Sequence, residues 1–219
     1  MITGISLGLA VPIGIGIGLF LSEVASTIVR SILQPCLDLL VGIPSVVYGF
    51  FGYMTLLPLF EKNFDMVTGE SILAAGLILA IMVLPFIASL SGEAFHSVPS
   101  EIKEAAMAQG VTPFYTIRMV IIPYAASGMF AAVSLGFARA IGETLAVLML
   151  AGNSIATPTS VLNRGQPLTA LIATELGEAG VDSDKYHALF GAGLLLLFVV
   201  LIINGGVWIL KGRLFQHDR

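Results

Sequence analysis

The sequence has little charge and almost no cysteine. Of its 219 residues, only 11 % are charged, whereas 57 % are hydrophobic and the mean hydropathy is +0.97. Because soluble globular proteins average about 25 % charged residues, much of this chain must face lipid or other apolar helices. The single cysteine, Cys36, cannot form an internal disulfide, and the three histidines have no zinc-ligand spacing. A disulfide-stapled secreted domain is therefore excluded, and we expect no metal site and no cofactor.

Positive charge is also scarce. Ten Lys and Arg stand against fourteen Asp and Glu, and the basic residues form no stripe along the chain. We therefore expect no nucleic-acid partner. The phosphate-binding signature of an ATPase, Gly-x-x-x-x-Gly-Lys-Ser/Thr, does not occur. The chain is accordingly expected not to be an enzyme, and any ATP hydrolysis must come from a separate subunit.

Apolar runs long enough to cross a bilayer recur along the chain. The first, residues 2–21, has twenty residues without a charge and would form about 30 Å of helix. Four more runs cover residues 39–60, 72–92, 124–150 and 187–210. Pro44 and several glycines interrupt the second run, so we expect a kinked or broken helix there. These runs predict an all-α, polytopic membrane helix bundle with five transmembrane spans, organised as a single domain over residues 1–219.

The distribution of basic residues predicts how the chain is oriented across the membrane. Five spans place the termini on opposite sides of the membrane. If the C-terminus is cytoplasmic, the inside segments hold six basic residues, which are Arg30, Lys103, Arg118, Lys211, Arg213 and Arg219. The outside segments then hold three, which are Lys62, Arg164 and Lys185. The excess of positive charge on cytoplasmic segments predicts an outside N-terminus and a cytoplasmic C-terminus.

The loop of residues 93–123, between the third and fourth runs, carries helix start and stop signals. Ser100 precedes a run of helix formers and reads as an N-cap. Gly110 suits the end of that helix, and Pro113 after Thr112 suits the first position of another. We therefore expect two short helices joined at a glycine, on the cytoplasmic side.

This loop also carries a motif with defined spacing. Glu104-Ala105-Ala106 is followed, after three intervening residues, by Gly110. After nine further intervening residues comes an apolar-x-apolar-Pro group that ends at Pro123. The pattern resembles the coupling loop of binding-protein-dependent ABC importer permeases. That resemblance implies that Glu104, Ala105, Ala106, Gly110 and Pro123 couple the chain to a cytoplasmic ATPase. It also implies that two ATPase subunits, a second permease subunit and an extracytoplasmic binding protein are its partners.

Two charged residues lie inside the fourth apolar run. Arg139 and Glu143 are four residues apart, so a continuous helix would place both on one face. Charges within a membrane span are costly and usually mark a mutual pair or a functional site. Two interpretations remain open at this point. The residues form an internal salt bridge, or Arg139 binds an anionic substrate that Glu143 helps to hold or release.

Three further segments narrow the resemblance. Residues 40–52 and 142–154 are similar to the permeases of phosphate importers, and residues 168–179 are similar to their C-type subunit. The resemblance implies phosphate as substrate, an A-type permease as the second subunit, and the inner membrane of a prokaryote as the location. The first residues of the chain resemble the second span of those permeases.

The interrupted second run adds two candidates for the substrate path. Ser45 and Tyr48 follow the break at Pro44 and could donate hydrogen bonds to an anion. A kink that serves only packing is the alternative. For the protein as a whole, a molybdate or sulfate permease and a non-transporting membrane scaffold or sensor are the alternative functions.

Overall fold

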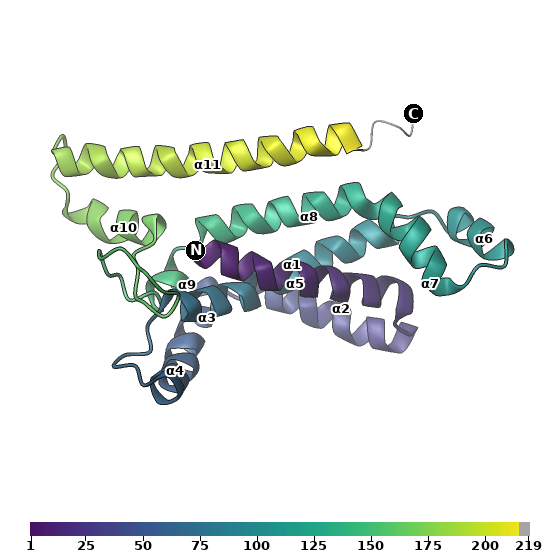
Figure 1. Cartoon of the computed structure of the whole chain (residues 1–219), viewed down its shortest axis with the longest axis horizontal. Coiled ribbons are helices and arrows are strands. Elements are labelled where there is room, and N and C mark those ends of the chain that lie inside the picture. The colour runs from purple at the N-terminus through teal and green to yellow at the C-terminus, as the bar shows by residue number, and fades with distance from the viewer. Residues whose placement is uncertain (215–219) are drawn as a thin grey trace. The chain divides into compact units, whose positions relative to one another are not determined.

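In a computed structural model of the protein, residues 1–214 are described, with side chains given up to Val207 and at Ile209 (Figure 1). The side chains of Lys211 and Arg213, and all of Arg219, lie outside this description, although the predicted orientation relies partly on them. The described residues form helices and no strands, with one isolated bridge between Gly152 and Gly165. The predicted all-α class is therefore confirmed.

The helices follow one another with short connections, and three stretches of π-helix and one of 3-10 helix continue them. In chain order they are α1 (Ile2–Leu19), η1 (Phe20–Val24), α2 (Thr27–Gly42), α3 (Ser45–Phe51), η2 (Gly52–Leu56), α4 (Leu57–Phe64), α5 (Ile72–His96), α6 (Ser100–Ala108), α7 (Pro113–Thr116), η3 (Ile117–Ile121), α8 (Ile122–Gly142), α9 (Leu145–Leu148), α10 (Leu168–Glu175), η4 (Leu176–Glu178) and α11 (Asp184–Leu214).

Four helical stretches in the described part are long and apolar enough to cross a membrane. They are Ile2–Val24, Ile72–His96, Pro113–Gly142 and Asp184–Val207. A fifth candidate is a broken pair, Thr27–Gly42 and Ser45–Phe64, whose two parts are bent by 93°. The predicted five spans thus correspond to four continuous spans and one broken one.

Two predicted boundaries are wrong. The second apolar run was predicted to begin at residue 39, but α2 already begins at Thr27. The break expected near Pro44 is confirmed, because α2 ends at Gly42 and α3 begins at Ser45. Pro44 is extended there, with φ −58° and ψ 138°, and its ring nitrogen has no hydrogen to donate to the ladder. The fourth run was expected to continue to residue 150, but α8 ends at Gly142. Mean hydropathy does not reveal the end of α8, because the segments on both sides of it are apolar.

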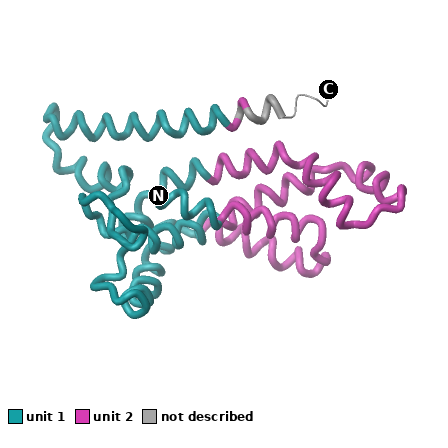
Figure 2. The backbone as a smooth tube through the Cα atoms, in the orientation of Figure 1, with its two compact units in different colours: residues 1–9, 43–83, 137–206 teal, residues 10–42, 84–136, 207–219 magenta. Residues whose placement is uncertain are grey.

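The chain forms two compact units, which Figure 2 distinguishes by colour. Unit 1 comprises Met1–Leu9, Ile43–Val83 and Phe137–Gly206, and unit 2 comprises Ala10–Gly42, Leu84–Gly136 and Val207–Arg219. The loop after α9 is fixed in unit 1 by backbone hydrogen bonds to the start of α5. The Ser71 amide donates to the Leu150 carbonyl at 3.0 Å, and the Ile72 amide donates to the Asn163 carbonyl at 3.0 Å. These bonds satisfy amides at the beginning of α5 that its own helix leaves without acceptors.

Unit 2 is built around the second half of α5. One cluster of buried side chains comprises Phe95, Val98, Ile121 and Ala125, and another comprises Leu21, Leu37 and Ala88. Gly14 and Gly18 of α1 lie against α5, as expected for a small-residue packing surface. Gly16 lies between them in sequence, but a Cβ there would meet nothing within 4 Å. Since it is two positions from either neighbour, it faces away from α5.

This packing gives a matched pair of variants. A Cβ at Gly18 would lie 2.7 Å from the Ala88 carbonyl oxygen and 2.8 Å from the Gly92 nitrogen, which are backbone atoms that cannot move aside cheaply. We expect Gly18→Ala to lower the free energy of unfolding by about 1–3 kcal/mol, as overpacking does. Gly16→Ala serves as the control and should leave stability unchanged or slightly higher. Thermal unfolding of the purified full chain in detergent measures both, and equal stability of the two variants would contradict the close contact.

Candidate functional site

All four residues predicted to line a substrate path belong to unit 1. Ser45 is the first residue of α3, and Tyr48 is buried one turn later. Arg139 is half-buried in the last turn of α8, and Glu143 follows directly after that helix. Both helix breaks, before α3 and after α8, therefore contribute residues to the same unit.

Close packing of α3 on α9 brings these breaks together. A Cβ at Gly49 would lie 2.9 Å from the Ala146 Cα, so the two backbones approach at a distance that only glycine allows. Tyr48 precedes this contact in sequence. The Arg139 guanidinium is near enough to the Tyr48 hydroxyl to act on it electrostatically. The structure thus places two of the predicted residues, Tyr48 and Arg139, within electrostatic range of one another.

Glu143 does not have the relation to Arg139 that the sequence suggested. The spacing of four residues implied a shared helix face, but α8 ends at Gly142 and no helix connects the two positions. A Glu143 carboxylate oxygen accepts a hydrogen bond from the Ala146 amide at 3.2 Å and so satisfies the start of α9. The Thr169 hydroxyl donates to the Glu143 carbonyl at 3.0 Å and ties α10 to the same break. Glu143 therefore has a structural role that its spacing did not predict.

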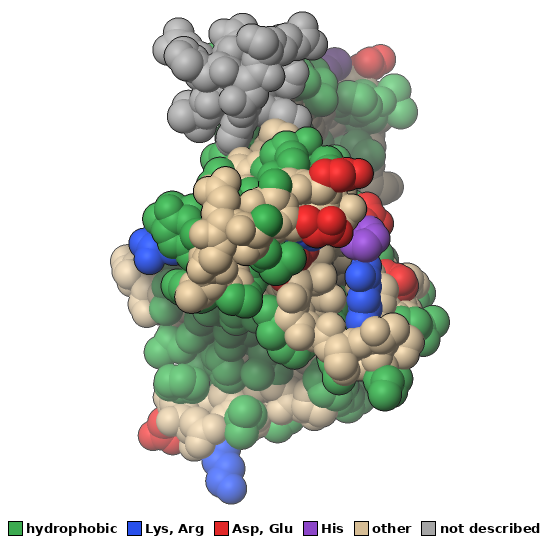
Figure 3. Space-filling view, turned by 90° about the vertical axis from the view of Figure 1, so that its right-hand side faces the viewer, with side chains coloured by type: hydrophobic (Ala, Val, Ile, Leu, Met, Phe, Trp, Pro, Cys, Tyr) green, Lys and Arg blue, Asp and Glu red, His purple; other side chains and the backbone are tan. Residues whose placement is uncertain are grey.

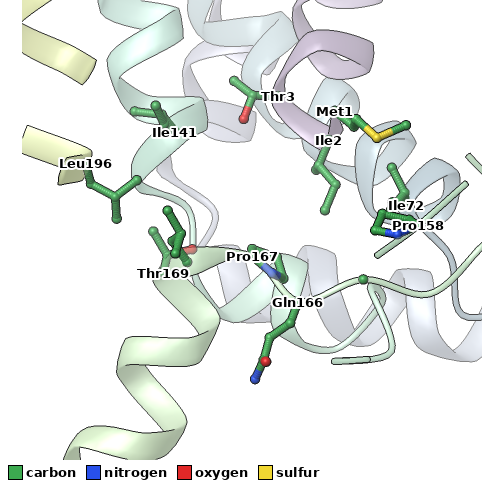
Figure 4. A pocket seen from close by; sticks show the side chains of 12 residues that line it. Met1, Ile2, Thr3, Ile72, Ile141, Pro158, Gln166, Pro167, Thr169 and Leu196 are labelled. Atoms are coloured by element: carbon green, nitrogen blue, oxygen red, sulfur yellow. The ribbon is translucent and has the colours of Figure 1, made fainter. Parts of the chain in front are cut away.

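A cavity of about 350 Å³ lies next to this break in unit 1. Its lining comes from several elements, including Thr3 of α1, Ile141 of α8, Thr169 of α10 and Leu196 of α11 (Figure 4). Most of the lining is apolar. Among the described residues that line it, none is one of the four predicted path residues.

The expected cytoplasmic loop forms two short helices, α6 and α7, in unit 2. Gly110 ends the first with φ +77°, the left-handed conformation that favours glycine. The Thr112 hydroxyl accepts a hydrogen bond from the Tyr115 amide at 3.3 Å, and Pro113 is the first residue of α7. These predictions are confirmed. Ser100 is instead the first residue of α6, whose N-cap is Pro99, so the predicted cap is wrong by one position.

The residues of the predicted coupling motif are exposed or half-buried. No residue of α6 is buried; Glu104 and Ala105 are exposed, and Ala106 is half-buried. Pro123, which ends the motif, is an exposed residue in the first turn of α8. Figure 3 looks onto the end of unit 2 that carries α6 and α7, where side chains of both charge signs appear among apolar ones. Such a mixed surface suits a protein partner better than the apolar interior of a membrane.

One sequence motif in the chain resembles a catalytic motif but lacks the structure that catalysis requires. Gly4-Ile5-Ser6-Leu7-Gly8 has the spacing of the Gly-x-Ser-x-Gly motif that carries the nucleophile of many hydrolases. That motif requires a sharp strand-to-helix turn. Here it lies inside α1, and Ser6 is fully buried. The pattern is therefore part of a membrane helix.

An ion pair in unit 2 was missed by sequence reasoning. The Lys103 ammonium of α6 donates to a Glu23 carboxylate oxygen of η1 at 2.7 Å. The two residues are 80 positions apart, and no local pattern connects them. The only feature of the sequence that could have indicated the pair is the charge of Glu23, just after the first apolar run.

The chain is similar in sequence to a known family of membrane proteins. The model of the family described as "Binding-protein-dependent transport system inner membrane component" matches residues 11–215. The chain belongs to this family. It is a permease component of an ABC importer in the inner membrane, and the ATPase of such an importer is a separate subunit.

Individual relatives show which permeases of this family the chain is similar to. The chain is 40 % identical over 206 residues to the probable ABC transporter permease protein YqgH of Bacillus subtilis, covering 92 % of this chain and 67 % of the relative. It is 35 % identical over 219 residues to the phosphate transport system permease protein PstC of Haemophilus influenzae, covering 91 % and 69 %. The chain thus spans about two thirds of the length of these relatives.

Solved structures agree on the permease fold. The methionine ABC transporter MetNI in an inward-facing conformation matches with a TM-score of 0.74 and 20 % identity, covering 97 % of this chain and 91 % of the other. An amino acid ABC transporter with histidines matches with a TM-score of 0.65 and 19 % identity, covering 97 % and 90 %. At this identity the likeness concerns the fold alone.

Proposed function

We propose that this chain is the C-type permease subunit of a phosphate importer and forms half of its translocation path. The observation that carries the proposal is Arg139 within electrostatic range of Tyr48 at a pair of helix breaks, in a chain 35 % identical to a phosphate permease. A guanidinium provides two parallel hydrogen bonds to a tetrahedral oxyanion, and a phenol adds a third. Ser45, at the start of α3, is a further donor to the same anion.

Glu143 acts indirectly in this proposal. Because its carboxylate accepts from the Ala146 amide, it fixes the break that follows Arg139. It thereby orients the last turn of α8 toward the anion. A negatively charged side chain close to the path also helps to release phosphate, since it competes for Arg139.

The proposed orientation places the N-terminus outside and the C-terminus in the cytoplasm. The loop of α6 and α7 then faces the cytoplasm, where Glu104, Ala105, Ala106, Gly110 and Pro123 meet an ATPase subunit. The complete importer contains a second permease of the A type, two ATPases and an extracytoplasmic phosphate-binding protein. All of residues 1–219 act as one permease domain.

Binding and hydrolysis of ATP shift this assembly between two conformations. Closure of the ATPases moves α6, and the helices reorient so that the path opens outward. Phosphate from the binding protein then reaches Arg139, and hydrolysis returns the path to its inward-facing form. The ligand and the nucleotide act only through their unequal affinity for the two conformations.

Uptake of radiolabelled phosphate into proteoliposomes tests the proposal. The chain is reconstituted with its candidate partner permease, ATPase and binding protein, and ATP is enclosed. We expect ATP-dependent uptake that unlabelled phosphate blocks and that molybdate and sulfate do not. Block by molybdate or sulfate would assign the chain to another oxyanion, and an assembled complex without any uptake would favour a scaffold or sensor.

A further inference from the structure

The carboxylate of Glu23 is an unusual group in unit 2. It lies in η1, the π-helical turn at the end of α1, and its side chain is only 8 % exposed. An ionised carboxylate removed from water needs partners to offset the loss of hydration. It has two donors, because the Lys103 ammonium approaches to 2.7 Å and the Ser22 hydroxyl to 2.8 Å.

Lys103 connects this carboxylate to the coupling motif. It is the residue immediately before Glu104, and its side chain is 21 % exposed. The rest of α6 contains no buried residue, so apolar packing holds this helix weakly. A nearly buried ion pair with 2.7 Å geometry is therefore a strong fixed contact between α6 and the end of the first span.

The π-helical turn shapes the acceptor side of this contact. The Ala25 amide donates to the Phe20 carbonyl at 2.8 Å, which is the five-residue spacing of a π turn. Such turns are rare and occur often at functional sites. Here the turn carries Glu23 and Ser22, the acceptor and the second donor of the same cluster.

We propose that the Glu23–Lys103 ion pair is a positioning link that transmits movement of the coupling helix to the first membrane span. The inference rests on the proposed function, in which α6 meets the ATPase. When an ATPase subunit displaces α6, Lys103 pulls on Glu23 and the end of α1 follows. Without the pair, α6 still binds the ATPase, but its movement is no longer passed to α1.

The test compares transport with hydrolysis in the same proteoliposomes of the complete importer. Glu23→Gln and Lys103→Met each remove the ion pair with little change in size. We expect each to lower the phosphate carried per ATP hydrolysed by about fivefold or more, while binding-protein-stimulated hydrolysis stays within about twofold of the wild type. Glu101→Gln, an exposed acid on the same helix, is the matched control and should leave the ratio unchanged.

The reversed pair distinguishes a link from a merely structural contact. Glu23→Lys combined with Lys103→Glu restores opposite charges across the same gap, with Ser22 still able to bond. We expect this double variant to recover most of the transport ratio. Unchanged ratios in both single variants, or a double variant no better than the singles in an assembled complex, would overturn the link. A wild type that hydrolyses ATP but carries no phosphate would instead contradict the proposed substrate, and the ratio is then measured with the anion that is carried.

Discussion

Replacing Arg139 with alanine should abolish most phosphate uptake while the importer still assembles. Hydrogen bonds to charged groups contribute about 1.5–3 kcal/mol, so the loss of this guanidinium should reduce uptake at low phosphate by about tenfold to a hundredfold. Because Arg139 is half-buried at the end of α8, its removal creates no large core cavity. Initial uptake rates over a range of phosphate concentrations measure the effect.

Two further variants make this result specific. Tyr48→Phe removes only the hydroxyl that lies within electrostatic range of Arg139 and should weaken uptake less, by about twofold to tenfold. Lys62→Ala removes a cation from an exposed position in α4 and should leave uptake unchanged. Wild-type uptake by a well-assembled Arg139→Ala complex would reject the role of Arg139 in the substrate path.

A bulky residue on the coupling helix should separate the permease from its ATPase. Ala105 is exposed, and α6 buries none of its residues, so Ala105→Trp has no internal contact to disrupt. At a packed interface, however, extra volume costs about 1–3 kcal/mol. We expect the ATPase recovered with the purified permease to fall by about tenfold or more, and uptake to fall with it. Co-purification in mild detergent, with quantification of each subunit, measures this loss.

The control for this variant is the same enlargement at an unrelated exposed position. Val67 is 96 % exposed in the loop between α4 and α5, so Val67→Trp adds surface area without touching α6. It should retain a normal amount of ATPase. If Ala105→Trp also retained the ATPase in full, the exposed face of α6 would not be the docking surface.

Local signals predicted the coupling loop well. Gly110, Thr112 and Pro113 act through their own backbone conformations, so the sequence contains nearly all the information that shapes the turn between α6 and α7. The apolar runs predicted the membrane helices for a similar reason, since twenty apolar residues suffice to span a bilayer.

Pro44 indicated the break before α3, but the start of α2, the end of α8 and the long-range contacts could not be predicted in the same way. α2 begins at Thr27 and includes Arg30 and Asp38, so it is too polar at its start to register as an apolar run. The helical spacing of Arg139 and Glu143 misled because the break after Gly142 changes the direction of the chain. The electrostatic proximity of Arg139 to Tyr48 depends on the packing of α3 on α9, which joins segments about a hundred residues apart.

The π-helical turns have a consequence for how unit 2 can move. A π turn holds one residue more than the hydrogen-bond ladder of an α turn requires, and each residue of an α-helix corresponds to about 100° of rotation. If such a turn changed to α geometry, every residue beyond it would be rotated by that amount about the helix axis. η1 carries the Glu23 partner of α6, and η3 connects α7 to α8. A displacement of the loop can therefore be converted into twisting of a span, which requires no tilt of the span against the surrounding lipid.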